Sequence, residues 1–167
     1  TISLRKETAV ALIRVICVSV YAQGARLIAV ANSHLEPEHI GSIKAAIEAV
    51  KRETGCPVAF PDKTRRRWAE KLSEEFRRGD CHAGSYETSL IMAAPPALVR
   101  EDIRKTLDRV PISISEKIRE GANTFREAGG TEAYFGDPQA ASMSEGEAMY
   151  DALSEMIVTS VMETLEP

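Results

Sequence analysis

Apolar and polar positions follow a regular order along the first sixty residues. Residues 6–21 have a high apolar density without Pro or Gly, so this segment is expected to form a helix covered on most sides. Residues 27–31 form a short continuous apolar run, which is typical of a strand buried on both faces of a parallel sheet. A second helix is expected at residues 37–55, with Pro37 in its first turn, and a shorter strand at residues 57–61.

Helical stripes continue in the middle of the chain. Residues 64–78 place three large apolar side chains four positions apart among charged residues, namely Trp68, Leu72 and Phe76. One narrow apolar stripe on an otherwise charged segment predicts a single surface helix. After a loop, a further helix is expected at residues 86–94, because two prolines follow and end it.

Turn signals divide the C-terminal third of the chain. The pattern is mixed at residues 97–123, whereas glycine-containing turns flank a short extended segment at residues 133–135. Ser142 and Glu145 have the Ser-x-x-Glu spacing of a capping box, and an apolar stripe continues from there to the C-terminus. A long helix is therefore expected as the last element.

The order helix, strand, loop, helix, strand, helix is typical of an open α/β sheet within a single domain, residues 1–167. The sequence contains no linker, internal repeat or low-complexity tract. In open α/β sheets, ligands bind beyond the carboxyl ends of the strands. The polar loop at residues 32–36, which follows the first predicted strand, is therefore the first place to expect a ligand site.

Composition narrows the functional classes. The chain has 167 residues, of which 44% are hydrophobic and 28% charged, so disordered and fibrous classes are excluded. The net charge of -4 argues against nucleic acid or an anionic membrane surface as the main partner. The longest apolar run, residues 9–20, contains Arg14 and is shorter than the about 20 residues that a membrane-spanning helix needs. Three widely spread cysteines suit a reducing compartment, so a cytoplasmic location is expected.

His34 and Glu36 lie two positions apart in the loop after the first predicted strand. In an extended backbone such residues point to the same side, which would let the imidazole and the carboxylate face one pocket. The two groups are a suitable ligand pair for zinc or manganese, and Asn32 would orient either one. The alternative is a polar loop in which Glu36 favours the positive end of the next helix. The spacing leaves both interpretations open.

A second group of chemically active side chains precedes the helix predicted at residues 86–94. His82 has small neighbours that would let a substrate come close. Imidazole has an ordinary pKa of about 6.5, which suits general acid or base catalysis at neutral pH. A helix-capping role for His82 is the alternative, and Glu87 in the first helical turn needs no function at all. Cys81 is a weaker nucleophile candidate, because adjacent side chains rarely face each other usefully.

The other charged motifs are better explained by structural roles than by ligand binding. The arginines at positions 65–67 and 77–78 alternate with glutamates, which is typical of a solvated helix face and not of a phosphate site. Asp137 lies between Gly136 and Pro138, where turn formation comes first and ligand binding second. The sequence contains neither a Gly-rich phosphate loop nor a Gly-x-Gly-x-x-Gly motif.

Four short motifs occur in order along nearly the whole chain. They are Thr1-Ile2-Ser3-Leu4, Asn32-Ser33-His34-Leu35-Glu36, the segment at residues 82–90, and Gly136-Asp137-Pro138 followed by Ala140-Ala141-Ser142. Together they resemble the creatininase family of metal-dependent amidohydrolases. The corresponding family signatures are Gly-Thr-Ile-Ser-Leu, Asn-x-His-x-Glu, His-Ala-Gly-Glu-x-Glu-Thr-Ser-Leu and Gly-Asp-Pro-x-x-Ala-Ser. This chain has Ser85 where Glu is frequent in the third signature.

The resemblance implies a three-layer α/β/α subunit with a mainly parallel central sheet, usually assembled as a homohexamer. It also implies two divalent metal ions, zinc or manganese, with His34 as a ligand of one and Glu36 as a ligand of the other. A metal-activated hydroxide would attack the carbonyl of a small-molecule cyclic or linear amide, and His82 would pass a proton to the leaving nitrogen. The remaining candidates are expected to support these groups or contact the substrate: Asn32, Tyr86, Glu87 and Asp137.

The family's other ligands, a Glu-x-His pair and an aspartate, belong to a strand and loop that precede the first helix. We therefore expect this chain to be the C-terminal part of a larger α/β domain of about 250 residues. Two ligands do not hold a dinuclear site, so this segment by itself is expected to bind little metal and to be inactive. The alternative is a non-catalytic oligomerisation or binding module that keeps the fold. The identity of the amide stays open.

Overall fold

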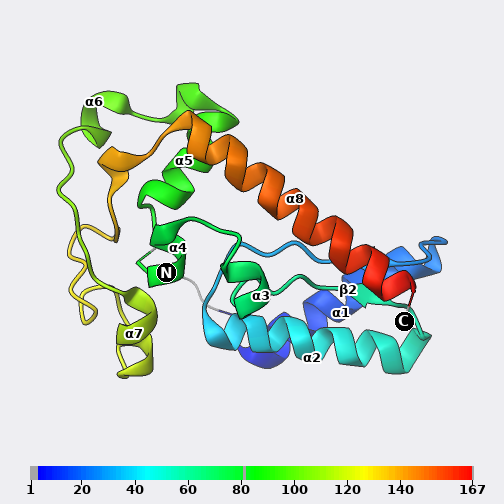
Figure 1. Ribbon diagram of the computed structural model, residues 1–167. Coiled ribbons are helices and arrows are strands. Elements are labelled where there is room, and N and C mark those ends of the chain that lie inside the picture. Colours follow the sequence, from blue (N-terminus) through cyan, green and yellow to red (C-terminus); the bar gives the residue numbers. More distant parts are fainter. Residues whose placement is uncertain (1–3, 81, 167) are drawn as a thin grey trace. The chain divides into compact units, whose positions relative to one another are not determined.

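A computed structural model of the chain describes residues 4–80 and 82–166 (Figure 1). Two compact units are present, the first formed by residues up to Trp68 and from Glu155 onward, and the second by Ala69 to Ser154. The first unit contains α1 (Lys6–Ala22), β1 (Ile28–Ala29), α2 (Pro37–Thr54) and β2 (Val58–Ala59), with α3 (Arg66–Ala69) at its boundary. The second contains α4 (Glu74–Arg78), α5 (Ser85–Ala93), η1 (Pro96–Leu98), α6 (Glu101–Arg104), α7 (Ile114–Arg119) and η2 (Pro138–Ala140). Helix α8 (Met143–Leu165) begins in the second unit and ends in the first.

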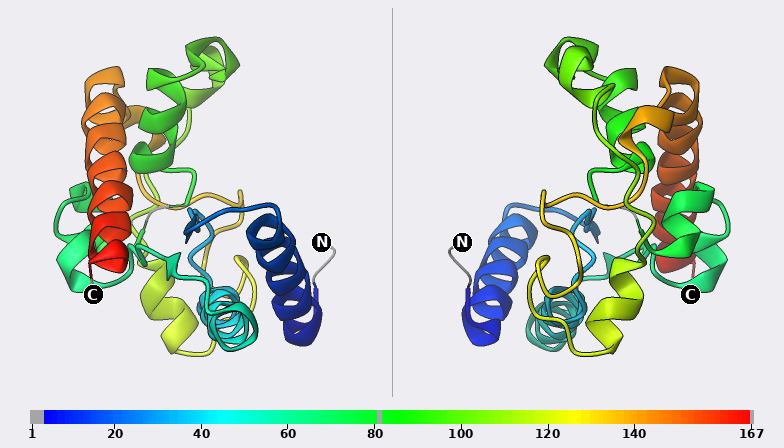
Figure 2. Two further views of the ribbon diagram at one scale, coloured as in Figure 1. Left: turned by 90° about the vertical axis from the view of Figure 1, so that its right-hand side faces the viewer. Right: turned by 90° about the vertical axis from the view of Figure 1, so that its left-hand side faces the viewer.

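The core of the first unit lies where α1 and α2 pack against the strands. Strands β1 and β2 pair in parallel, with Ile28 opposite Val58, and α1 and α2 lie side by side in Figures 1 and 2. Cys17, Val50 and Cys56 form a buried cluster in this core, and burial raises the pKa of both thiols. Both predicted strands are present, each shorter than the apolar run that indicated it, and the predicted α/β class is confirmed.

Helix α2 begins and ends where its sequence signals predict. Pro37 occupies the first turn, where its missing N–H costs no hydrogen bond. Gly55 follows the helix in the left-handed conformation at φ 71°, and its N–H donates to the carbonyl of Lys51. The basic pair Lys51 and Arg52 lies in the last turn, where positive charge complements the helix dipole.

Helix α1 differs from the expectation that it would be covered on most sides. Cys17 on its inner face is buried, whereas four apolar side chains on other positions are 41% to 54% exposed: Leu12, Val15, Ile16 and Val20. Spacings of three and four positions place these side chains on one stripe of the helix. The described residues thus leave one apolar stripe of α1 uncovered.

The prediction of one surface helix at residues 64–78 is wrong. The segment forms two short helices, α3 and α4, separated at Ser73, whose hydroxyl accepts a hydrogen bond of 3.3 Å from the N–H of Phe76. Serine bonds to the backbone in this way more readily at a helix start than inside a helix. The apolar stripe is also buried, because Trp68, Leu72 and Phe76 are each almost inaccessible to solvent.

Short antiparallel bridges organise the second unit. His82 pairs with Phe135, and Val110 pairs with Gly136. The segment predicted to be extended at residues 133–135 therefore contributes one partner to a bridge, while α5 ends at Ala93 just before the two prolines, as predicted. The mixed stretch at residues 97–123 contains the short helices α6 and α7.

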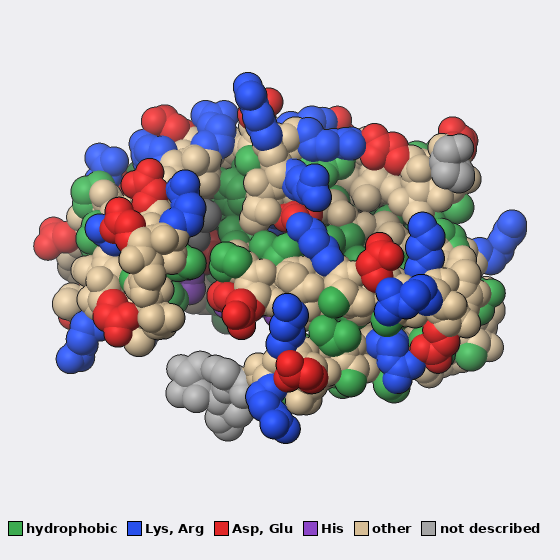
Figure 3. Space-filling view, turned by 90° about the horizontal axis from the view of Figure 1, so that it is seen from below, with side chains coloured by type: hydrophobic (Ala, Val, Ile, Leu, Met, Phe, Trp, Pro, Cys, Tyr) green, Lys and Arg blue, Asp and Glu red, His purple; other side chains and the backbone are tan. Residues whose placement is uncertain are grey.

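Surface charges of both signs are interspersed on the face shown in Figure 3. Arg67 pairs with Glu163 over 2.8 Å, and Arg78 pairs with Glu74 over 3.0 Å. The arginine groups singled out in the sequence thus contribute to exposed ion pairs with glutamates, as expected for a solvated face. Within the described residues, no helix combines the length and apolar character needed to cross a bilayer.

Candidate functional site

The first group of candidate residues surrounds the loop between β1 and α2. The amide of Asn32 donates to the carbonyl of His34 over 2.6 Å and accepts from the N–H of His34 over 3.2 Å. The Asn32 oxygen also lies 3.1 Å from Nε2 of His39. The rings of His34 and His39 meet edge to face at 5.1 Å between centroids. Asn32 therefore orients this loop, and His39, which the sequence interpretation left without a role, belongs to the same cluster.

Glu36 caps helix α2. Its Oε1 accepts from the N–H of Glu38 over 2.9 Å, and its Oε2 accepts from the N–H of His39 over 2.7 Å. The structure therefore contains the interaction with the start of α2 that was the alternative role of Glu36. A carboxylate offers about four lone-pair sites, so two accepted N–H bonds leave acceptor capacity for a further partner.

The donor types of this cluster fit zinc or manganese, because imidazole and carboxylate are ligands of both metals. The number of donors does not fit. Across residues 4–80 and 82–166, no three His, Cys, Asp or Glu side chains are grouped closely enough to hold a metal ion. His34 and Glu36 thus amount to part of a coordination sphere.

His82 lies in the second unit, on the loop before α5. Its carbonyl accepts a hydrogen bond of 2.8 Å from the N–H of Phe135. Its half-buried imidazole lies 4.4 Å from the ring of Phe125 and 6.5 Å from the ring of Phe135, measured between centroids. The backbone of His82 is fixed by the bridge, and its ring lies against an apolar wall. Cys81 lies outside the described residues.

Glu87 folds back from the first turn of α5 onto the His82 loop. Its Oε2 accepts a hydrogen bond of 2.8 Å from the N–H of Ala83, and Ala83 has a positive φ of 53°, which a residue with a side chain rarely adopts. Glu87 thus stabilises the unusual backbone directly after His82. Tyr86 on the same helix is buried, with its ring 5.1 Å from that of Phe76.

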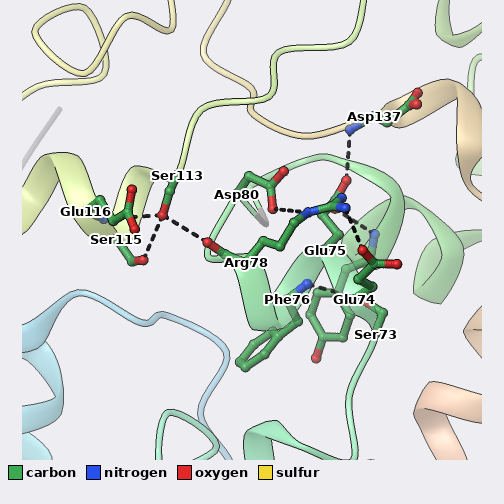
Figure 4. Close-up of polar contacts among 11 residues, drawn as sticks. Ser73, Glu74, Glu75, Phe76, Arg78, Asp80, Ser113, Ser115, Glu116 and Asp137 are labelled. Carbon is green, nitrogen blue, oxygen red and sulfur yellow. Dashed lines mark hydrogen bonds and ion pairs between the residues drawn. The ribbon is translucent and has the colours of Figure 1, made fainter.

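Glu75 is a site residue that the sequence interpretation missed. It is only 3% exposed. Its two carboxylate oxygens accept hydrogen bonds from the N–H groups of Tyr86 and Asp137, over 2.9 Å and 2.8 Å (Figure 4). In the sequence Glu75 is one of many glutamates on a charged segment, so no local pattern marks it as buried.

A cavity of about 450 Å³ lies beside Glu75 in the second unit. Asp137 lines it, and the Asp137 carboxylate also accepts a hydrogen bond of 3.2 Å from the N–H of Ala140, which makes it the cap of η2. The turn role expected of Asp137 is therefore present. The cavity wall carries charges of both signs; its residues are Glu74, Glu75, Arg78, Ser85, Arg109, Asp137, Ala140, Ser142 and Glu145.

The predicted site residues thus form one group in each unit. Asn32, His34 and Glu36 lie in the first unit, joined by His39. The second unit contains His82, Tyr86, Glu87 and Asp137, and Glu75 connects the backbone positions of Tyr86 and Asp137.

Comparison with known proteins gives one family and one fold. The family model named Creatininase and described as creatinine amidohydrolase matches residues 1–161. Among curated proteins, no sequence match was found. Solved structures with the same fold include a glutamate-to-glutamine mutant creatininase of the Zn-Zn type, with a TM-score of 0.70 and 20% identity over 100% of this chain and 67% of that one.

Two further solved structures give the same result. A mutant creatininase complexed with creatine has a TM-score of 0.69 and 20% identity, covering 100% of this chain and 68% of that one. A structure named creatininase Mn has a TM-score of 0.68 and 21% identity, covering 100% and 67%. At this identity the likeness shows the fold.

Proposed function

The chain belongs to the creatininase family, and from this premise we propose that it is a hydrolase that cleaves a C–N bond of a cyclic or linear small-molecule amide. The observation that carries the proposal is the geometry around His82. Its carbonyl is held by Phe135, and Glu87 holds the N–H of the next residue, Ala83. A catalytic acid or base must stay in place relative to the bond that breaks, and this loop meets that requirement.

His82 would move the proton that amide hydrolysis requires. Water adds its oxygen to the amide carbonyl carbon and loses a proton, which a ring nitrogen of His82 would accept. The same ring nitrogen would then donate this proton to the amide nitrogen as the C–N bond breaks, giving an acid and an amine. Phe125 covers one side of the imidazole and would keep bulk water from that side.

Metal binding by His34 and Glu36 is a second part of the proposal. It is supported by their donor types and by the related structures named Zn-Zn type and Mn. Where the family's full set of metal ligands is present, we expect two divalent ions per subunit. Because the described donors are too few, we expect the 167-residue chain to retain less than about one zinc or manganese ion after dialysis. Elemental analysis showing near two ions per chain would contradict this expectation.

The experiment that tests the function is an activity screen of the purified protein against cyclic amides, formamides and short peptides, with zinc or manganese added. We expect at least one amide to be hydrolysed when the metal site is filled. His82→Ala should lower kcat by about 10² to 10⁴-fold while metal content stays the same. Asp102→Ala, an exposed carboxylate on α6, is the matched control and should leave kcat unchanged. If metal is lost together with activity, His82 is a ligand and not the acid or base.

We also propose that the protein assembles with copies of itself through the exposed stripe of α1. Exposed apolar stripes of this kind are common at subunit interfaces. Ile16→Glu should therefore reduce the molar mass measured by light scattering, whereas Gln23→Glu at the end of the same helix should not. An assembly that forms without any amide hydrolysis would favour the alternative of a non-catalytic oligomerisation module.

A further inference from the structure

Glu75 joins two backbone segments that are distant in sequence. One segment contains Gly84 and Tyr86 at the start of α5, and the other contains Gly136 and Asp137 before η2. Each carboxylate oxygen of Glu75 accepts one backbone N–H, from Tyr86 on one side and from Asp137 on the other (Figure 4). A neutral side chain of the same size does not offer two acceptor oxygens in this geometry.

The start of α5 depends on this carboxylate. Its N-cap residue is Gly84, which has no side chain to accept the free N–H groups of the first turn. Glu75 supplies the missing acceptor from α4 and places a negative charge at the positive end of the helix dipole. The cap of α5 is therefore provided by a residue nine positions before the N-cap residue.

Both glycines beside Glu75 leave the space that its carboxylate occupies. A Cβ at Gly84 would collide with Oε1 of Glu75 and with the carbonyl oxygen of Phe135. A Cβ at Gly136 would collide with Oε2 of Glu75, and Gly136 also has a φ of 89°, which disfavours any side chain. The two backbones approach the carboxylate as closely as glycine allows, so a small displacement of Glu75 must be transmitted to both.

These two segments flank the backbone bridge that holds His82. Gly84 follows His82 by two positions, and Gly136 follows Phe135, whose N–H donates to the carbonyl of His82. We propose that Glu75 is a positioning residue, whose carboxylate holds the His82 loop and the Phe135 segment in the register that aims the His82 imidazole at the amide. This inference rests on the proposed function. Both oxygens of Glu75 accept backbone N–H groups, so its effect on the reaction passes through the position of His82.

The test compares Glu75→Gln with Glu116→Gln in the active enzyme. The two substitutions remove the same charge within the second unit, but Glu116 is exposed on α7 and is not among the residues that line the cavity beside Glu75. A misplacement of about 1 Å costs about 10²-fold in rate, so Glu75→Gln should lower kcat by about this factor with KM changed less than about twofold. Glu116→Gln should leave both constants within about twofold of wild type.

A spectroscopic readout separates positioning from loss of folding. The ring of Phe125 lies 4.4 Å from the imidazole of His82, so its ring current shifts the NMR signals of the imidazole protons. In Glu75→Gln these signals and the amide signals of Tyr86 and Asp137 should move, while signals from the first unit stay in place. Unchanged imidazole signals, or an unchanged kcat in a folded variant, would overturn the proposal.

Gly84→Ala provides a second variant with the Glu75 side chain intact. Its new Cβ enters the space of Oε1 of Glu75 and of the Phe135 carbonyl oxygen, so it should displace the same two segments and reproduce the kcat loss and the shifted imidazole signals. A wild-type kcat in folded Gly84→Ala would also overturn the positioning role. His82→Ala distinguishes failure of the positioning role of Glu75 from failure of the proposed function. If His82→Ala is inactive and Glu75→Gln is fully active, only the positioning role fails, whereas a fully active His82→Ala overturns the proposed function and the inference with it.

Discussion

The hydroxyl of Ser89 donates a hydrogen bond of 2.6 Å to Oε2 of Glu145, a residue 56 positions away in sequence. The same hydroxyl accepts a hydrogen bond of 3.0 Å from the N–H of Ser142. In a simple capping box Glu145 would reach the N–H of Ser142 itself. Here the hydroxyl of Ser142 accepts from the N–H of Glu145 as expected, but Ser89 on α5 stands between the Glu145 carboxylate and the Ser142 N–H.

Replacing Ser89 by alanine should therefore destabilise the start of α8. The fully buried hydroxyl bonds to a carboxylate and to a backbone N–H, and both partners would lose it. A free-energy loss of about 2 kcal/mol is expected, measured by urea unfolding. Ser154→Ala is the control, because this serine is exposed on the same helix and its replacement should cost nothing. Equal unfolding midpoints for the two variants would show that the Ser89 contact contributes no net stability.

Asp62 makes the stability of the first unit sensitive to acid. Burial by itself would raise the pKa of Asp62, but hydrogen bonds from Lys44 and Thr64 outweigh it and hold the pKa below its ordinary value. The Lys44 ammonium lies 2.6 Å from Oδ2, and the Thr64 hydroxyl donates to Oδ1 over 2.6 Å. Because the folded pKa is lowered, this stabilisation is complete above the unfolded pKa of about 3.9 and is lost as pH falls through the folded value.

Asp62→Asn should accordingly destabilise the protein by about 2 kcal/mol at pH 7, because hydrogen bonds to a charged group are lost. The difference from wild type should shrink as the pH falls below about 4. Unfolding free energies measured from pH 7 to pH 3 check this, with the exposed carboxylate Asp151 replaced by asparagine as the control. A difference that is constant over the whole pH range would mean that the charge of Asp62 contributes nothing.

Arg104 fixes the segment that contains Asp137. Its Nη1 donates to the carbonyls of Pro138 and Gln139, each over 2.8 Å. Its Nε and Nη2 donate to the two oxygens of Glu101 over 2.9 and 2.8 Å.

Lysine lacks this fork of donors, so Arg104→Lys should release η2 although the charge is kept. Hydrogen exchange at the N–H of Ala140 and Ala141 should accelerate by about tenfold, whereas Lys105→Arg on the exposed side should leave it unchanged. Unaltered exchange in Arg104→Lys would contradict the role.

Local signals in the sequence predicted the ends of α2 but not the break between α3 and α4. Pro37 and Gly55 mark α2 correctly, because their backbone requirements are intrinsic to the residues. The spacing of Trp68, Leu72 and Phe76 fits one continuous helix, yet Ser73 between them begins a new one. A periodic pattern records which side chains are apolar, whereas the choice of Ser73 as a cap depends on packing around it.

In the candidate site, too, the sequence revealed residues that lie within one short motif and missed a residue whose partners are distant. His82 and Glu87 were found in the sequence because they lie within one short motif, and in the structure the Glu87 carboxylate accepts a hydrogen bond from the N–H of Ala83, directly after His82. Glu75 was missed, since its partners Tyr86 and Asp137 are 11 and 62 positions away. The only sequence trace of Glu75 is a pair of glycines whose missing side chains make room for it, and glycines have many other reasons to occur.

Glu36 offers a test that separates helix capping from metal binding. Both oxygens of its carboxylate accept N–H groups of α2, so Glu36→Gln, which leaves one acceptor, should cost about 1 kcal/mol in urea unfolding without metal. Glu38→Gln is the control, because this exposed first-turn residue contributes only through the helix dipole and should cost about 0.3 kcal/mol.

A metal ion that binds only the folded state adds stability according to its concentration and affinity, so the unfolding free energies are then measured with zinc or manganese added. If Glu36 is a ligand, wild type and Glu38→Gln gain stability with metal while Glu36→Gln gains less, and the gap between the two variants widens. If Glu36 is a cap alone, metal changes the unfolding free energies of all three proteins equally. The difference between Glu36→Gln and Glu38→Gln then stays at its metal-free value. We expect a widened difference where the full set of metal ligands is present and a constant difference in the 167-residue chain, because His34 and Glu36 supply only part of a coordination sphere.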